Sequence, residues 1–467
     1  MGILMEELSV KQIAEAVNGK LIRGIKEQTA SDVCIDSREA KPGDIFFAII
    51  GEFNDGHRFM KSAYDRGCRV MVISDCMAGA NVPDDCTLIL AEDSLYALQE
   101  LAAKYISKFD LRKIAVTGSV GKTTTRDMIY AVLRRKFTTG TSKKNLNSET
   151  GMPMTLLSFD KSMQAAVIEM GMDAPGQISR LTEIARPDIA VITNIGYSHL
   201  EKLGSRENIF RAKMEIVEGF DKDKVLVINS DDDMLSKIDE EKAPYRIVRA
   251  GQAASSDFRV EDVKNHGSEG ISFLLINEGK SHLIRLAVPG EHNAVNAALA
   301  AAACSCMGIS MQDIIEGLSD IKMTGNRLKV MKIGEVSIID DSYNAAPESM
   351  ISALKTLKSS GGDRKLAVLA GMNELGEISE EAHRKVGMEA AKINIDLLIT
   401  IGEKGNQIAE GAKDAGMNAD RMLHFDSKEA FVKRMDEVIM PRDIVLLKAS
   451  RSFELEKLVD NIKEIFA

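Results

Sequence analysis

The stretch that decides the fold is Ile114-Ala115-Val116-Thr117-Gly118-Ser119-Val120-Gly121-Lys122-Thr123-Thr124-Thr125. An apolar run leads into a glycine-bracketed turn, and a segment with apolar residues at helical spacing follows. Strand, loop and helix in this order form a phosphate site, because loop amides and the positive helix end face the anion. We therefore expect ATP or a similar nucleotide here, with Lys122 on the outer phosphates and Thr123 on Mg²⁺. The expected nucleotide contacts are Gly118, Ser119, Val120, Gly121, Lys122, Thr123 and Thr124.

The glycine spacing of this loop is unusual. The common phosphate loop reads G-x-x-x-x-G-K-[ST], which would require glycine where this chain has Val116. The loop here is the shorter G-x-x-G-K-T. An ordinary glycine turn with a surface lysine is the alternative, and the flanking strand and helix disfavour it.

Composition fits a large soluble enzyme. The chain has 467 residues, 45% hydrophobic content and a net charge of −10, which argue for about three domains and against binding of nucleic acid or anionic membranes. The six cysteines form no C-x-x-C pair, as expected for reduced thiols in the cytoplasm. No apolar run reaches the roughly 18 residues of a membrane span, and no signal segment is evident, so we expect no membrane insertion.

The order of strands and helices predicts an α/β protein with three domains. Residues 1–92 read as a small α/β domain, and residues 93–323 as a central phosphate-loop domain with a mostly parallel sheet. Residues 324–467 repeat the alternation of strands and helices, which predicts a Rossmann-like, doubly wound domain.

Two further residues follow predicted strands and could carry chemistry. Glu169 ends the apolar strand near residues 166–168, where open α/β sheets place ligand-binding groups, and it is a candidate Mg²⁺ ligand. His199 lies just past another strand end. A capping or surface acid and a structural histidine are the alternatives. For the acid cluster at 231–233 we prefer a helix cap and a solvated turn.

Taken together, these stretches resemble the Mur ligases, ATP-dependent amide-forming enzymes of peptidoglycan precursor synthesis. The resemblance covers nearly the full chain. It rests on the ordered segments TGSVGKT from Thr117, IEMG around Glu169, TNIGYSHLE around His199, RAKMEI around Lys213 and PGEHNAVNAALAAA from Pro289. Folylpolyglutamate and cyanophycin synthetases share part of this set, so the central block alone fixes only the superfamily.

The flanking blocks resemble the branch of the family that adds D-alanyl-D-alanine. DSREAKPGDIFFA from Asp36 resembles the uridine-nucleotide domain of both the third and the fourth Mur ligases. The segments that resemble the fourth ligase, which adds D-alanyl-D-alanine, are NLNSETGMP from Asn145, DDSYNAAPESM from Asp340, NELG from Asn373 and KASRS from Lys448. Family members more often have asparagine at 148, isoleucine at 150 and asparagine at 346, where this chain has Ser148, Thr150 and Ala346. These differences do not change the class of enzyme that we expect, but they leave its substrate preference less defined. The resemblance implies that UDP-N-acetylmuramoyl-tripeptide and D-alanyl-D-alanine are the partners, with a monomeric enzyme.

The resemblance also implies roles for individual residues. Lys122, Glu169, His199 and Lys213 would be catalytic, with Thr123, Glu169, His199 and Lys213 holding metal, the lysine as a carbamate. Asn293 and Asn296 would lie on the purine side, and Arg327 and Asp341 would reach the phosphates and ribose of ATP. Ser37 and Arg38 would bind the uridine nucleotide, and Asn147 and Ser148 the substrate. Alternatives are a solvated helix lysine at 213 and an ordinary turn at 37–38.

Two rival functions remain open from the sequence. Another amino-acid ligase of the superfamily, the third Mur ligase or a folylpolyglutamate type, would keep Lys122, Glu169 and His199 with a different acceptor. A nucleotide-dependent switch would bind ATP without joining anything. The combination of Glu169, His199 and Lys213 weighs against the switch.

Overall fold

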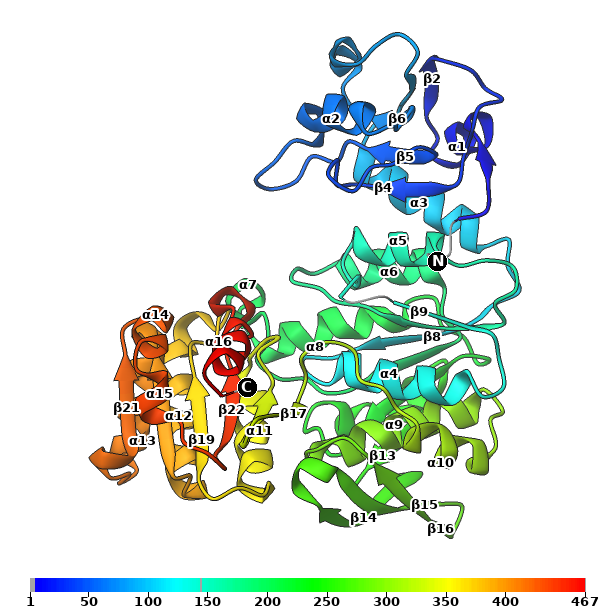
Figure 1. Cartoon of the computed structure of the whole chain (residues 1–467). Helices are drawn as coiled ribbons and strands as arrows, with labels where there is room; N and C mark the ends of the chain where they lie inside the picture. The colour runs from blue at the N-terminus through cyan, green and yellow to red at the C-terminus, as the bar shows by residue number, and fades with distance from the viewer. Residues whose placement is uncertain (1–4, 143–144, 467) are drawn as a thin grey trace.

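A computed structural model describes residues 5–142 and 145–466. Three α/β parts, each built on its own sheet, follow one another along the chain (Figure 1). They confirm the expected fold class. The described residues include no helix that is both long and apolar enough to cross a membrane.

The N-terminal part is a small mixed sheet with helices on both sides. Its strands have the order β2-β7-β6-β5-β4, and Phe46 and Met71 face α2 while Phe47 and Val72 pack toward α1 and α3. Its elements are β1 (Leu8–Ser9), α1 (Val10–Ala16), β2 (Lys20–Arg23), β3 (Thr29–Ala30), β4 (Asp32–Cys34), β5 (Asp44–Phe47), η1 (Gly56–Phe59), α2 (Met60–Asp65), β6 (Val70–Ile73), η2 (Cys76–Asn81), β7 (Thr87–Leu90) and α3 (Ser94–Ile106).

The central part holds a large sheet of order β16-β15-β14-β13-β12-β11-β8-β10-β9. The strands from β9 to β14 pair in parallel, and β14, β15 and β16 extend the sheet antiparallel. The elements are β8 (Arg112–Thr117), α4 (Lys122–Leu133), β9 (Thr139–Thr141), α5 (Gly151–Leu157), β10 (Ala165–Glu169), α6 (Gln177–Ala185), β11 (Ile189–Ile192), α7 (Leu200–Leu203), α8 (Arg206–Met214), η3 (Glu215–Val217), β12 (Val225–Asn229), η4 (Leu235–Lys237), η5 (Glu240–Lys242), β13 (Arg246–Gly251), β14 (Phe258–Asn265), η6 (Gly267–Glu269), β15 (Ile271–Asn277), β16 (Lys280–Leu286), α9 (His292–Cys306) and α10 (Met311–Ser319).

The uninterrupted apolar runs of this sheet follow from burial on both faces. Successive strand side chains point to opposite sides, so Ile114 and Val116 pack against α4, α9 and α10, while Ala115 packs toward α5, α6 and α8. Helices cover both faces of these strands, so their central positions are apolar and charges such as Glu169 stand at the strand ends. This is why β8, β10 and β11 are recognisable in the sequence.

The C-terminal part is doubly wound, with strand order β17-β18-β22-β19-β20-β21. Ala367 and Leu369 of β19 face α11, α12 and α13, and Leu366 and Val368 face α14, α15 and α16. The elements are β17 (Lys329–Ile333), β18 (Val336–Asp340), α11 (Pro347–Ser359), β19 (Lys365–Leu369), η7 (Gly376–Ile378), α12 (Ser379–Ile393), β20 (Leu397–Ile401), α13 (Gly402–Asp414), η8 (Ala419–Arg421), β21 (Met422–Phe425), α14 (Lys428–Val432), α15 (Met435–Val438), β22 (Ile444–Lys448), η9 (Arg451–Phe453) and α16 (Lys457–Phe466).

The topology of the central sheet places the site. The chain leaves β8 toward β9 and β10 on one side and then crosses to β11 on the other. Ligands of open α/β sheets bind outside the carboxyl ends of strands where the order reverses in this way. The loop after β8, Glu169 at the end of β10 and His199 after β11 all lie at this edge.

Candidate active site

A cavity of about 740 Å³ lies between the central and C-terminal parts and gathers most of the predicted site. The residues that line it include Ser119, Val120, Gly121, Lys122, Thr123, Thr124, Asn147, Ser148, Glu169, His199, Asn293, Asn296, Arg327 and Asp341. Gly118 and Lys213 do not line it, and Ser37 and Arg38 lie in the N-terminal part.

The segment after β11 holds the phosphate loop in place through hydrogen bonds. The amides of Ser119 and Val120 donate to the carbonyl and side-chain oxygens of Asn194, each at 3.0 Å, and Oγ1 of Thr193 donates to the Val120 carbonyl. A Cβ on Gly118 would lie 1.8 Å from Oγ1 of Thr193, so only glycine fits there. Since two loop amides are already engaged, the donors for an anion are the first-turn amides of α4.

Lys122 is the cation of this loop. Its Nζ folds back onto the carbonyl oxygens of Gly118 and Ser119, at 2.7 and 3.2 Å. Burial lowers the pKa of Lys122, while the charge of Glu169 opposes that shift. A phosphate oxygen in the cavity would give this half-buried ammonium a counter-charge in place of two neutral carbonyls.

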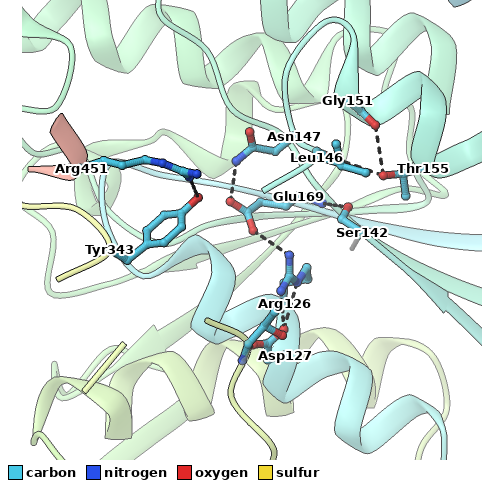
Figure 2. Close-up of polar contacts among 11 residues, drawn as sticks. Arg126, Asp127, Ser142, Leu146, Asn147, Gly151, Thr155, Glu169, Tyr343 and Arg451 are labelled. Carbon is cyan, nitrogen blue, oxygen red and sulfur yellow. Dashed lines mark hydrogen bonds and ion pairs between the residues drawn. The ribbon is translucent and has the colours of Figure 1, made fainter. Parts of the chain in front are cut away.

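Glu169 is buried and held from two sides (Figure 2). Its Oε1 accepts from Nδ2 of Asn147 at 2.7 Å, and its Oε2 accepts from Nη1 of Arg126 at 3.2 Å. Arg126 also donates to Oδ1 of Asp127 from Nε and Nη2, at 3.0 and 2.6 Å. The surface acid that the sequence left as an alternative is therefore wrong for Glu169.

His199 adopts a left-handed backbone at the start of α7, with φ of 64°. Its Nδ1 lies 2.6 Å from Oε2 of Glu374, an ion-pair distance, although the two atoms lack the alignment of a hydrogen bond. The imidazole lowers the pKa of Glu374. His199 thus stands at the contact between the central and C-terminal parts.

Lys213 is a buried side chain of α8, with 2% relative exposure. The solvated helix lysine considered from the sequence is therefore wrong. Burial, and after it the charge of Lys122, lowers the pKa of Lys213 well below its ordinary value. A neutral amine beside the nucleotide loop is the form that reacts with CO₂ to give a carbamate.

Two asparagines of α9 close the side of the cavity next to the loop. Asn296 donates from Nδ2 to Oδ1 of Asn293 at 2.9 Å, and Asn293 donates to the Pro289 carbonyl at 2.7 Å. Oδ1 of Asn296 lies so near the loop that a Cβ on Gly121 would approach it to 2.8 Å. The pair therefore sets the width of the cavity at that point.

The C-terminal part contributes charged groups from the opposite wall. Arg327 lies over the ring of Tyr343, with 4.3 Å between its Cζ and the ring centroid. Asp341 accepts from the buried Nζ of Lys448 and from the amide of Leu328. These contacts present a guanidinium and a carboxylate to the same cavity as the phosphate loop.

The two residues predicted for the uridine nucleotide lie apart from this cavity. Arg38 forms a forked ion pair with Asp36, which lowers the pKa of that acid to about 2, and Ser37 is buried beside it. The uridine role of Ser37 and Arg38 stays a prediction.

Sequence reasoning missed several residues of the site. Asn194, His292 and Lys448 line the cavity, although their segments were recognised for their neighbours. For Lys448, a charge at the end of the apolar strand β22 was the available signal. Nothing in the sequence pairs Arg126 with Glu169, which is 43 positions away.

Few protein groups in the site could bind a metal ion. Among residues 5–142 and 145–466, no cluster of three or more His, Cys, Asp or Glu side chains could hold a metal ion. Thr123 and Glu169 supply oxygen donors to one cavity. This suits Mg²⁺, which usually takes one or two carboxylates and completes its shell with substrate phosphates and water.

Comparison with known proteins places the chain in a family. It matches the models for the "Mur ligase family, catalytic domain" (residues 29–105), the "Mur ligase middle domain" (116–304) and the "Mur ligase, glutamate ligase domain" (326–451). The chain belongs to the Mur ligase family, a family of ATP-dependent ligases.

Several of its relatives within this family share one name. The UDP-N-acetylmuramoyl-tripeptide–D-alanyl-D-alanine ligase of Bacillus subtilis is 37% identical and covers 98% of this chain and 99% of its own length, and that of Escherichia coli is 32% identical with the same coverage. A crystal structure of MurF from Acinetobacter baumannii matches with a TM-score of 0.90 at 30% identity, covering 98% of this chain and 99% of its own. MurF from Thermotoga maritima in complex with ADP matches with a TM-score of 0.81 at 28% identity, covering 93% and 97%.

Proposed function

We propose that this protein joins D-alanyl-D-alanine to UDP-N-acetylmuramoyl-tripeptide, with ATP converted to ADP and phosphate, in peptidoglycan precursor synthesis. The observation that carries the proposal is the shared cavity. There the phosphate loop and Glu169 of the central part face Arg327 and Asp341 of the C-terminal part. The relatives named for this reaction, which match over almost the whole chain, support the choice of substrates.

The chemistry begins with a carboxylate that has no leaving group. Transfer of the γ-phosphoryl group of ATP to the peptide carboxylate forms an acyl phosphate and releases ADP. The step brings two anions together, so positive groups must offset their repulsion. Lys122, Arg327 and the first-turn amides of α4 would do this, and their place in one cavity supports the assignment.

The amine of D-alanyl-D-alanine then attacks the acyl carbon. A C–N bond forms, the C–O bond to the phosphoryl group breaks, inorganic phosphate leaves and the nitrogen gives up its proton. Water would compete with the amine for the same carbon. Because the cavity is enclosed between two domains, it would keep water away from the acyl phosphate and so prevent its hydrolysis.

We propose Mg²⁺ as the metal, held by Thr123 and Glu169, with His199 and a carbamate on Lys213 serving a second ion. The oxygen donors that line the cavity fit a hard cation, and the neutral state that burial favours at Lys213 fits carbamylation. Bound Mg²⁺ would offset phosphate charge. Asn293 and Asn296 would contact the purine, Asp341 the ribose, Asn147 and Ser148 the substrate, and Ser37 and Arg38 the uridine nucleotide.

We further propose that the enzyme is a monomer in the cytoplasm.

The proposed reaction is tested by measuring ADP release with different pairs of substrates. The protein is given ATP with the UDP-tripeptide, in its lysine and diaminopimelate forms, plus D-alanyl-D-alanine. Parallel reactions contain a UDP-dipeptide plus the third amino acid, or folate plus glutamate. Release of ADP only with the first pair is expected. Release only with another pair, or nucleotide binding with no amide product by mass spectrometry, would reject the assignment.

A further inference from the structure

One short segment after β11, residues 194–199, contacts both the phosphate loop and the C-terminal part. On the side of the loop, the amide of Gly196 donates to Oγ of Ser119 at 2.8 Å, and Oγ of Ser198 donates to the Ser119 carbonyl at 3.3 Å. The Ser119 amide donates to the carbonyl of Asn194. Because the segment binds Ser119 at its amide, hydroxyl and carbonyl, the position of the loop follows the position of the segment.

Acidic residues after β12 brace the base of segment 194–199. Oδ2 of Asp232 accepts from the amide of Ile195 at 2.8 Å, while its Oδ1 caps the following turn. Nη2 of Arg206 donates to the Ile195 carbonyl at 2.8 Å and to Oδ1 of Asp233 at 2.6 Å. The cap that the sequence predicted for this acid cluster is present, and the same acids also fix the segment to the central part.

The other side of the segment meets the C-terminal part. The ring of Tyr197 packs against the hydrophobic core of that part, on the face of its sheet that α11, α12 and α13 cover. A Cβ on Gly196 would lie 2.9 Å from Oε1 of Glu348, the second residue of α11. Just after the segment, the amide of Glu201 donates to the Glu374 carbonyl at 3.1 Å, and α7 lies beside the C-terminal part (Figure 1).

Tyr197 is an aromatic side chain of one part that packs into the core of another. It is half-buried, and Cζ of Arg206 lies 5.4 Å from its ring centroid, so the ring lies between a guanidinium of the central part and the apolar core of the C-terminal part. Tyrosine gives a large contact area at a low cost in conformational entropy, which makes it an effective anchor at an interface.

We propose that Tyr197 is a positioning residue, which docks the C-terminal part on the segment that also holds the phosphate loop. The C-terminal part carries Arg327 and Asp341, so docking through Tyr197 fixes these side chains relative to Lys122. The inference rests on the proposed function for the reaction that is positioned. Without the ring, the loop still binds nucleotide, but the domain that completes and closes the site is held loosely.

The test compares the amide that is formed with the phosphate that is released. A docked C-terminal part keeps water from the acyl phosphate, so the wild type should form amide and phosphate in equal amounts. Tyr197→Ala should release phosphate in excess of amide, and its kcat for amide should fall roughly 10- to 100-fold, as for the loss of an interface anchor. Its KM for ATP should change by less than about threefold, because the backbone of segment 194–199 still holds the loop.

Two further variants separate docking from stability. Tyr197→Phe keeps the ring and should keep both the kcat and the equal amounts of product. Tyr245 is also half-buried, and it packs edge-on against Phe220 in the core of the central part, with ring centroids 5.8 Å apart. Tyr245→Ala should lower the thermal unfolding midpoint without excess phosphate. In small-angle X-ray scattering with an ATP analogue, Tyr197→Ala alone should have a larger radius of gyration than the wild type.

The outcomes distinguish the two proposals. A wild-type protein that makes no amide from D-alanyl-D-alanine overturns the proposed function, and the scattering comparison then decides on the docking alone. An active wild type whose Tyr197→Ala variant keeps its kcat and equal amounts of product overturns only the positioning role. An unchanged radius of gyration in Tyr197→Ala overturns the docking. A raised KM for ATP with an unchanged kcat overturns the positioning role as well, because the ring would then support only the nucleotide loop.

Discussion

At the scale of single residues, the site depends on charged groups that burial holds in unusual states. Lys122 and Lys213 are two lysines near one another, and burial lowers the pKa of both. Glu169 is kept in place by a guanidinium and an amide. Each of these groups is more costly to bury alone than with an anion or a partner present.

Carbamylation of Lys213 is directly observable. With ¹³C-bicarbonate, the protein should give a carbamate carbonyl signal in its ¹³C NMR spectrum, because burial lowers the pKa of Lys213 and so favours the neutral amine that reacts with CO₂. Lys213→Met should lack this signal, and Lys202→Met, at an exposed lysine of α7, should retain it. Identical spectra for wild type and Lys213→Met would show that Lys213 is not the modified residue.

His292 makes stability depend on pH. His292 is an exposed residue at the start of α9, and desolvation in the cavity that it lines lowers its pKa from 6.5 to about 4. Between these values the unfolded chain binds more protons than the folded one, so the free energy of unfolding falls as pH drops through this window.

His292→Gln should remove that loss. Its unfolding midpoint temperature should decrease less than that of the wild type between pH 7 and pH 4.5, measured by circular dichroism. Parallel midpoint curves for the two proteins would show that His292 does not titrate in this way.

At the scale of elements, the loop after β8 acts with the segment after β11 as one structure. Asn194 and Thr193 hold the loop backbone, and Gly118 leaves room for that contact. Gly118→Ala should therefore displace the loop and weaken ATP binding by about 5- to 150-fold, since overpacking costs about 1–3 kcal/mol. Isothermal titration calorimetry measures this.

A glycine without neighbours supplies the control. Gly219 also has a positive φ, 74°, but a Cβ there would meet nothing within 4 Å. Gly219→Ala should cost about 1–2 kcal/mol of backbone strain and leave ATP affinity unchanged. Equal ATP affinity in the two alanine variants would contradict the role given to Gly118.

The elements also show how far the sequence predicts this fold. Apolar runs predict β12 and β20 with their observed bounds, Val225–Asn229 and Leu397–Ile401, because both faces of these strands are buried. The sequence does not predict β14 and β16, because exposed polar residues interrupt the buried ones in both strands. Strand ends likewise predict Glu169 and His199. Partners such as Arg126 and Glu374 come from contacts that only the folded chain makes.

At the scale of the whole molecule, a polar chain links the site to the connection between two domains. Glu169 bonds Arg126, Arg126 bonds Asp127, and Oδ2 of Asp127 accepts from the amide of Thr324 at 2.7 Å (Figure 2 shows the first two contacts). Thr324 lies between α10 and β17 and precedes Arg327. The nucleotide site and the domain that completes it are thus fastened by one buried network.

Asp127→Asn should loosen this fastening. In Asp127, one carboxylate oxygen accepts from Arg126 and the other accepts from the amide of Thr324. Asparagine has an NH₂ group in place of one of these oxygens, so one of the two hydrogen bonds is lost. Trypsin cleavage after Lys322 should become faster than in the wild type, and saturating ATP analogue should protect the variant less. Asp320→Asn, at an acid that is exposed just before the connection, is the control. Equal cleavage rates in Asp127→Asn and wild type would contradict the role of Asp127.

The central claim is that this cavity activates a peptide carboxylate with ATP and passes it to an amine. The most direct measurement uses UDP-N-acetylmuramoyl-tripeptide with both oxygens of the reacting carboxylate labelled with ¹⁸O, together with ATP and D-alanyl-D-alanine. Mass spectrometry of the products should find one labelled oxygen in the inorganic phosphate and the other in the new amide. Unlabelled phosphate, or phosphate released without any amide product, would contradict the claim.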